Sequence, residues 1–217
     1  LWASMHNVVV KHYHADNGRF AYNAWLADIA RKGQTLSYCG VGAHFQNGKA
    51  ERRIRTLQDL GRSQLLHAKF RWPMAISLHL WPYAVRNVVN CLNDTPATGQ
   101  TQTRIERFIG NDIRPNLKDH HHFGIPVYVL DDDLQSGKKI SKWAMRARLG
   151  IYLGKSPRHA RSVSLILNPR TGMVSPQFHL KFDDNFDTIK NEKVEEHGQW
   201  KYKCGFVKLD GSDIIQR

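Results

Sequence analysis

Asp16 and Glu51 are the carboxylates of this sequence whose positions best suit chemistry on a metal ion. Asp16 follows the β-branched run Val8 to Val10 and precedes an Asn-Gly turn signal. Glu51 follows a glycine-rich loop and falls in the first turn of an expected helix. Because sites in α/β sheets form outside the carboxyl ends of strands, a strand end and a helix start can direct two carboxylates at one point. Such oxygen ligands predict Mg²⁺ (or Mn²⁺) as the cofactor.

Each carboxylate alone has a simpler interpretation. An Asp before Asn-Gly is ordinarily a turn residue, and a Glu in the first turn of a helix ordinarily complements the helix dipole. The residues around the pair favour the metal interpretation.

The charge balance indicates a polyanionic partner. The sequence holds 32 Lys and Arg against 19 Asp and Glu, a formal net charge of +13. No apolar stretch approaches the roughly 18 to 20 residues of a membrane span, so we expect nucleic acid and no membrane. Cys39, Cys91 and Cys204 are far apart and form no CxxC pair, which indicates a reducing, intracellular compartment. The first residues do not have the pattern of a signal peptide, and we expect an excerpt of a longer chain.

The first half of the sequence has the order of an α/β layer. A strand ending near His14 is followed by a helix in 20–33, a short strand in 34–39, a loop and a long helix in 49–70. The long helix is predicted to bury an apolar stripe. The stripe comprises Ile54, Leu57, Leu65 and Ala68.

The second half changes from helix to short strands. A further helical region begins at Trp72, with Pro73 at a first-turn position and Pro82 kinking it or starting a new helix. Residues 94–119 are polar and irregular, as in a linker. Short strands separated by turns then predict an all-β module. The strands are expected in 125–130, 147–154, 161–168 and 173–182.

Two groups of polar residues are candidates for contact with nucleic acid. The first surrounds the start of the long helix. The second belongs to the stretch from Lys138 to Arg161, which holds eight cations and no acid. The first group is Asn47, Lys49, Arg52, Arg55 and Arg62, and the second is Lys138, Lys139, Lys142, Arg146 and Arg148. The alternatives are a solvated, salt-bridged helix face, a helix-capping Asn47 and the wet face of a barrel. Trp143 and Tyr152 could stack on bases or lie in the core.

Other candidates favour structural roles. The run His120 to His122 cannot all face one ion, and Asp183 and Asp184, beside His179, close a strand. The three aspartates from Asp131 to Asp133 indicate a hairpin turn. The tryptophans at apolar helical positions or helix starts predict core packing, and they are Trp25, Trp72 and Trp81.

The stretches "HADNGRF", "GVGAHFQNGKAERRIR" and "LWPYAVRNVVNCLNDTP" resemble the integrase of copia-type long-terminal-repeat retrotransposons. The later stretches "FGIPVYVL", "KWAMRARLGIYLGKS" and "TGMVSPQFHLKFDDNF" resemble the segment that follows the catalytic core in that family. The resemblance covers roughly residues 6–189. It implies the C-terminal part of an RNase H-like core in 1–115, an SH3-like β-barrel in 120–189 and a flexible tail in 190–217.

On this resemblance, Asp16 matches the second aspartate of the catalytic triad and Glu51 matches its glutamate. The first aspartate and a His/Cys zinc module belong upstream of Leu1. The implied activity is DNA integration, in which two metal ions assist 3′-end processing and strand transfer. Asp16 would hold both ions and Glu51 one. With two of three carboxylates, we expect this chain alone to be inactive.

The resemblance also implies partners and a location. The partners are element-end DNA, target DNA and other integrase protomers. The intact protein would be part of a Gag-Pol polyprotein, first in a cytoplasmic virus-like particle and then in the nucleus. The alternatives are a non-enzymatic nucleic-acid-binding remnant of a decayed or domesticated element, and a protein-interaction module whose binding would not depend on salt.

Overall fold

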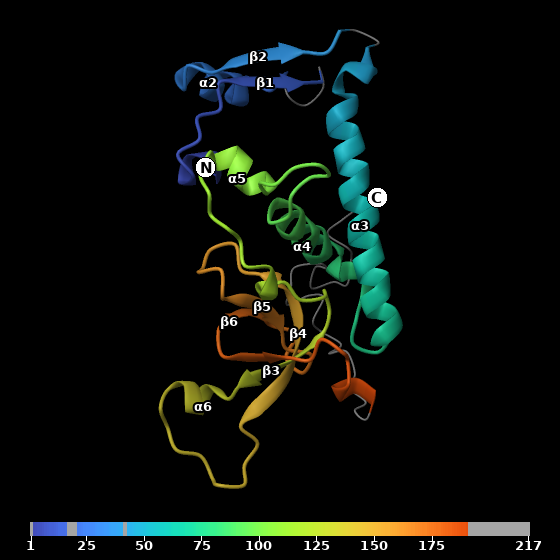
Figure 1. The fold of residues 1–217 in the computed structure, drawn as a ribbon, viewed down its shortest axis with the longest axis vertical. Helices are drawn as coiled ribbons and strands as arrows, with labels where there is room; N and C mark the ends of the chain where they lie inside the picture. The colour runs from blue at the N-terminus through green and yellow to red at the C-terminus, as the bar shows by residue number, and fades with distance from the viewer. Residues whose placement is uncertain (1, 17–20, 41–42, 191–217) are drawn as a thin grey trace. The chain divides into compact units, whose positions relative to one another are not determined.

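Short strands and amphipathic helices alternate along the chain and give a mixed α/β structure (Figure 1). The computed structural model describes residues 2–16, 21–40 and 43–190. Two compact units divide the chain. Unit 1 is Leu1–Gln58 with Asn93–Arg114, and unit 2 is Asp59–Leu92 with Pro115–Arg217. Residues 191–217, which hold almost all of the expected tail and Cys204, lie outside the described residues.

A small parallel sheet forms the centre of unit 1. Strand β1 (His12–Ala15) pairs in parallel with β2 (Thr35–Tyr38), and helix α2 (Asn23–Arg31) makes the crossover that parallel strands require. The ring of Tyr13 meets that of Trp25 edge to face, with centroids 5.6 Å apart. Gly33, with φ of 62°, follows the end of α2. The strand–helix–strand order predicted for this region is confirmed.

The first strand is shorter than its sequence predicts. Val8 to Val10 lie outside β1, and Val9 is 77% exposed. The partner strand β2 has four residues, so its ladder can pair only with His12–Ala15. A short helix, α1 (Trp2–Met5), precedes this segment.

Unit 1 also contains a helix in the segment expected to be irregular. Helix α5 (Arg104–Ile109) begins with a capping box in which Thr103 and Glu106 bond to each other's backbone N–H. Gly110 ends the helix in the left-handed conformation. The interpretation of this segment as a linker was therefore wrong in part.

Helix α3 (Gly48–Arg71) begins in unit 1 and ends in unit 2. Leu65 and Ala68 are buried as predicted, whereas Ile54 is exposed. The buried residues of α3 are Gly61, Leu65 and Ala68, so its first eleven residues, Gly48–Gln58, contribute none to a core. The predicted stripe is correct only for the second half of the helix.

Unit 2 is built on an antiparallel sheet of five strands, in the order β6-β5-β4-β3-β7. Among the described residues no ladder joins the edge strands, so the sheet is open rather than closed into a barrel. The strand predicted in 173–182 is two strands, and the others lie where their sequences predict them. The strands are β3 (Pro126–Leu130), β4 (Ala147–Lys155), β5 (Ser164–Leu167), β6 (Val174–Gln177) and β7 (Leu180–Phe182).

Two apolar clusters stabilise unit 2. One joins the second half of α3 and helix α4 (Trp81–Asn93) to strands β4 and β5, and it includes Trp72. The other lies around Tyr152 and Phe186. The core prediction is confirmed for Trp72 and wrong for Trp81, which is about half exposed at the start of α4. Pro82 follows Trp81 and starts a new helix, as one of the two alternatives predicts.

Short helices complete unit 2, and one of them corrects a prediction. Helix α6 (Asp132–Gln135) follows β3, and the side chain of Asp131 caps it by accepting the N–H of Asp133. The three aspartates therefore start a helix rather than form a hairpin turn. The 3-10 turns of unit 2 are η3 (Leu78–Leu80), η4 (Leu117–Asp119) and η5 (Thr188–Lys190), and unit 1 has one among its described residues, η2 (His44–Asn47). Within the described segments, no helix combines the length and apolarity needed to cross a bilayer.

Candidate functional site

Asp16 lies directly after β1 in unit 1, at the carboxyl end of a strand in a parallel sheet. The N–H of Cys39 donates to the carbonyl of Ala15 at 2.9 Å, so the pairing of the two strands extends to this end. The carboxylate of Asp16 is exposed. The turn predicted at Asn17 and Gly18 lies outside the described residues. The position of Asp16 is thus the one that its sequence predicts.

Glu51 lies in the first turn of α3 and is also exposed. Before this helix, the side chain of Gln46 accepts the N–H of Gly40 at 2.9 Å. In Figure 1 the arrows of β1 and β2 both point toward the N-terminal end of α3. Within the described part of the chain, neither Asp16 nor Glu51 forms an ion pair, so both carboxylates are available to a cation.

Packing does not hold the two carboxylates in a fixed site. The first eleven residues of α3 bury no side chain, and productive metal geometry requires ligands that their surroundings hold in place. The residues that the structure describes contain no group of three His, Cys, Asp or Glu side chains that could hold a metal ion. Asp16 and Glu51 can therefore supply at most part of a ligand set.

A polar network that the sequence does not predict covers one face of the two-stranded sheet. Ser37 Oγ lies 2.9 Å from His12 Nε2 and 2.8 Å from His14 Nδ1. His12 Nδ1 also bonds to Thr35 Oγ1, and His14 Nε2 lies 3.5 Å from Cys39 Sγ. Alternation along the strands explains the grouping, because every second side chain points to the same face. This network occupies the face beside Asp16.

The cations at the start of α3 are exposed. Lys49, Arg52 and Arg55 lie in unit 1 and Arg62 in unit 2. Among the described residues, no ion pair neutralises these four side chains. The salt-bridged alternative is thus not observed, which favours contact with phosphate. Asn47 is the last residue of η2 and is half-buried.

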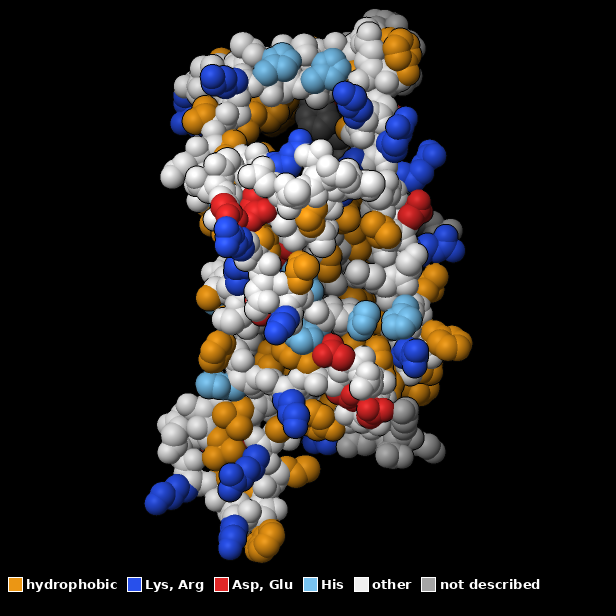
Figure 2. All heavy atoms as spheres, in the orientation of Figure 1, with side chains coloured by type: hydrophobic (Ala, Val, Ile, Leu, Met, Phe, Trp, Pro, Cys, Tyr) orange, Lys and Arg blue, Asp and Glu red, His pale blue; other side chains and the backbone are white. Residues whose placement is uncertain are grey.

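The second cationic group lies in unit 2, in the loop between α6 and β4, which we call the basic loop (residues 138–146). Lys139, Lys142 and Arg146 are exposed, whereas Lys138 forms an ion pair with Asp133 at 2.9 Å. The Lys142 ammonium lies 5.5 Å from the ring centre of Trp143, which is 89% exposed. Figure 2 shows Lys and Arg side chains together with apolar ones at this loop.

Two other members of the cationic stretch do not belong to its surface. Arg148 is half-buried in β4, and its Nη1 atom has no hydrogen-bond partner among the described residues. Lys155 is only 8% exposed and lies 3.3 Å from the Nε2 atom of His120. The stacking alternative for Tyr152 is excluded, because its ring is fully buried. The stretch from Lys138 to Arg161 is therefore not one continuous cationic surface, because its residues in β4 are half-buried or buried.

A groove of about 590 Å³ lies beside the base of the basic loop in unit 2. It lies next to the edge strand β7 and combines aromatic, imidazole and ammonium groups. Its lining residues are Tyr128, Leu130, Ala147, His179, Leu180 and Lys181. An aromatic ring beside cations is a common surface for single-stranded nucleic acid.

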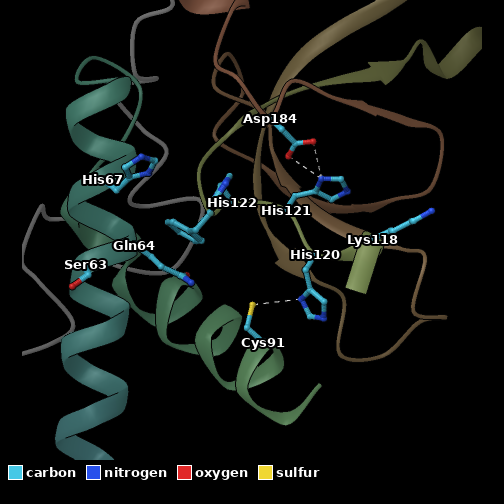
Figure 3. A pocket seen from close by; sticks show the side chains of 10 residues that line it. Ser63, Gln64, His67, Cys91, Lys118, His120, His121, His122 and Asp184 are labelled. Atoms are coloured by element: carbon cyan, nitrogen blue, oxygen red, sulfur yellow. Dashed lines mark hydrogen bonds and ion pairs between the residues drawn. The ribbon is translucent and has the colours of Figure 1, made fainter. Parts of the chain in front are cut away.

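The three consecutive histidines point in different directions, as Figure 3 shows. His120 Nδ1 lies 3.4 Å from Cys91 Sγ, and His121 Nδ1 lies 2.9 Å from an oxygen of Asp184. The ring of His122 lies 6.0 Å from that of His67. Burial, then the charges of Arg71 and His122, lower the pKa of His67. The prediction that these histidines do not share one ion is confirmed.

Asp183 has a structural role, as predicted. Burial opposes its ionisation, but hydrogen bonds from Thr188, and then from the backbone of Asp187, outweigh this effect and lower the pKa of Asp183.

No model of a known protein family and no curated protein matches this sequence.

Proposed function

We propose that this chain is part of a copia-type integrase, in which Asp16 and Glu51 supply two of the carboxylates for metal-dependent joining of element DNA to target DNA. One observation carries the proposal. Asp16 directly follows a strand of a parallel sheet, and Glu51 lies in the first turn of the helix that comes after the second strand and its glycine loop. Sites in α/β folds form at such strand ends.

The resemblance also extends to the finer fold. We propose an RNase H-like origin for the α/β part, supported by the parallel pairing of β1 with β2 and by the crossover helix α2. We propose an SH3-like module for the five antiparallel strands, supported by the consecutive pairing of β3 to β6 and by the return of β7 to the edge beside β3. The edge strands of that sheet are not paired with each other in the described residues, so a closed barrel is proposed and not observed.

The exposed carboxylates suit a hard divalent cation. Asp16 and Glu51 offer only oxygen donors, which are the ligands of Mg²⁺ and Mn²⁺, and no ion pair competes for them in the described residues. When bound, such an ion neutralises charge on the phosphate and activates the attacking oxygen. A third carboxylate would have to come from another segment or chain.

The remaining residues would bind and orient DNA. Lys49, Arg52 and Arg55 lie within four residues of Glu51 in sequence, so phosphate bound to them would lie near that carboxylate. The basic loop would bind a second stretch of backbone without reading its sequence. Other integrase protomers would be partners of the intact protein.

A second candidate function is DNA binding without catalysis. The first half of α3 buries no side chain, so Glu51 is not held at a defined distance from Asp16. The cationic groups need no such precision, because phosphate contacts tolerate flexible side chains. Binding of a divalent cation separates the two candidates.

The test is a Mn²⁺ titration of the full chain bound to a short DNA duplex, followed by electron paramagnetic resonance. The proposal expects a population of bound Mn²⁺ in the unaltered chain. Asp16→Asn and Glu51→Gln should each abolish it, because both carboxylates hold the same ion. Asp112→Asn is the control, since Asp112 is an exposed acid of unit 1 that forms an ion pair with Arg114. It should keep the bound population.

Two outcomes contradict the proposal. If both site variants bind as much Mn²⁺ as the unaltered chain, Asp16 and Glu51 hold no ion and the non-catalytic candidate is favoured. If only one variant loses binding, the carboxylates do not share an ion and the proposed catalytic pair is wrong.

A further inference from the structure

A pocket in unit 2 contains a thiol beside a hydrogen-bonding base. The pocket has a volume of about 780 Å³, which suits a small ligand (Figure 3). Its walls come from α3, α4, the segment 118–123 and the turn after β7. The residues that line it are Ser63, Gln64, His67, Cys91, Lys118, His120, His121, His122, Phe123 and Asp184.

A chain of two polar contacts leads to the thiol. Lys155 Nζ lies 3.3 Å from His120 Nε2, and His120 Nδ1 lies 3.4 Å from Cys91 Sγ. An ammonium group can only donate, so Nε2 of His120 accepts and its proton lies on Nδ1. The Nδ1–H group then donates to the sulfur. A donor in this position can hydrogen-bond to the sulfur while it attacks as a thiolate, which is the nucleophilic form.

The other titratable groups near Cys91 do not replace His120 as its hydrogen-bond partner. Tyr152 is fully buried, and burial, then the proximity of Cys91, Asp184 and Asp119, raises the pKa of Tyr152. Its hydroxyl therefore stays protonated and cannot act as a base near neutral pH. Asp184 bonds to His121 at 2.9 Å.

The lining of the pocket favours an anionic reagent. Lys118 contributes an exposed ammonium to the lining, and the ammonium of Lys155 lies behind His120, 3.3 Å from its Nε2 atom. Against these two ammonium groups, Asp184 is the one carboxylate among the residues described as lining the pocket, and one of its oxygens lies 2.9 Å from His121 Nδ1. A small molecule with carboxylates would therefore be attracted to the thiol.

We propose that Cys91 is a site of reversible S-thiolation by small disulfides that carry carboxylates. The Cys91 thiolate attacks one sulfur of the reagent, the reagent's S–S bond breaks, and a new S–S bond joins Cys91 to one half. The other half leaves as a thiolate and takes up a proton, which balances the one that the Cys91 thiol released to water. This site is independent of Asp16 and Glu51.

The test compares two disulfides of similar size on the unaltered full chain. Dithiodipropionate carries two carboxylates, and cystamine carries two ammonium groups. Peptide mass spectrometry follows the mixed disulfide at each cysteine with time. Cys91 should react several-fold faster with dithiodipropionate than with cystamine, and faster than Cys39, which is only 7% exposed although it also contacts a histidine.

Variants then test the role of His120. His120→Gln should slow the reaction of Cys91 by about tenfold, since the attacking sulfur would lose its contact with the imidazole. His159→Gln is the matched control, because His159 is an exposed histidine of unit 2 that bonds to Ser156 and is not among the residues lining the pocket, and it should leave the rate unchanged. The proposal is overturned if Cys91 reacts no faster than Cys39, if cystamine reacts as fast as dithiodipropionate, or if folded His120→Gln keeps the full rate.

Discussion

The carboxylate of Glu106 accepts hydrogen bonds from the backbone N–H and the hydroxyl of Thr103, each at 2.8 Å. Its second oxygen accepts the backbone N–H groups of Ile113 and Arg114, at 3.2 and 2.7 Å. One buried carboxylate thus connects the start of α5 to the chain that follows the helix. The bonds from Thr103, and then the one from Arg114, lower the pKa of Glu106 from 4.5 to about 2.

We expect this carboxylate to make stability depend on acid pH. In the unfolded chain Glu106 takes up a proton near pH 4.5, whereas in the folded chain it stays ionised until about pH 2. Its contribution is therefore complete above pH 4.5 and is lost as the pH falls toward 2. Thermal unfolding followed by circular dichroism should show a melting temperature that falls across this range. Glu106→Gln should melt lower at pH 7 and should show a shallower fall in acid.

Two further variants test the origin of this effect. Thr103→Ala removes the cap of α5 and should cost about 1 kcal/mol at neutral pH. Glu51→Gln is the matched control, because Glu51 is exposed in the first turn of α3 and forms no ion pair in the described residues. If Glu106→Gln and Glu51→Gln change the fall of melting temperature in acid equally, the total charge of the chain, and not this hydrogen-bond network, sets the pH dependence of stability.

The capping box also shows what sequence patterns can and cannot predict. The spacing Thr103-x-x-Glu106 is a helix-start signal, and with it α5 could have been predicted inside the segment expected to be irregular. The β-branched run at Val8 to Val10 predicted a strand that its short partner β2 does not support. Local patterns thus gave most elements, but the length of a strand depends on a partner far along the chain.

The same limit applies to the candidate sites. Asp16 and Glu51 lie at a strand end and a helix start, as their flanking residues predict. The contact of Cys91 with His120 joins residues 29 positions apart, and no spacing rule indicates it. The burial of Lys155 depends on how β4 packs, and the run of cations in the sequence does not indicate it.

Close packing of α3 against α4 predicts a large effect of one methyl group. A Cβ atom at Gly61 would lie 2.8 Å from Val85 Cγ2, well inside van der Waals contact. Gly61→Ala should therefore lower the free energy of unfolding by about 1 to 3 kcal/mol, because the two helices must move apart. Urea denaturation of the full chain, followed by tryptophan fluorescence, measures this change.

The chain offers a matched control for this substitution. Gly48 lies in the same helix, and a Cβ atom there would meet no atom within 4 Å. Gly48→Ala should leave stability unchanged or raise it by about 0.5 to 1 kcal/mol, since alanine favours the helix. Val85→Ala should partly rescue Gly61→Ala in the double variant. If the two glycine substitutions have the same effect, helix propensity rather than contact with α4 explains the result.

The basic loop predicts salt-dependent binding to DNA. Lys139, Lys142 and Arg146 are exposed, and none of them forms an ion pair in the described residues. Replacing all three with alanine should weaken binding to duplexes of unrelated sequence alike. The slope of log affinity against log salt should fall by up to about 0.9 for each phosphate that the variant no longer neutralises, because fewer counterions are released. Fluorescence anisotropy with labelled duplexes at several salt concentrations measures both quantities.

A second triple variant separates binding by the basic loop from the effect of net charge. Arg31, Lys32 and Arg114 also carry three positive charges, but each forms an ion pair with an aspartate. Replacing them with alanine removes the same formal charge and should change the salt slope much less, because their charges are already partly neutralised. If both triple variants lower the slope equally, DNA responds to total charge and the basic loop is not its binding surface. If neither does, the cations at the start of α3 become the main candidates for phosphate contact.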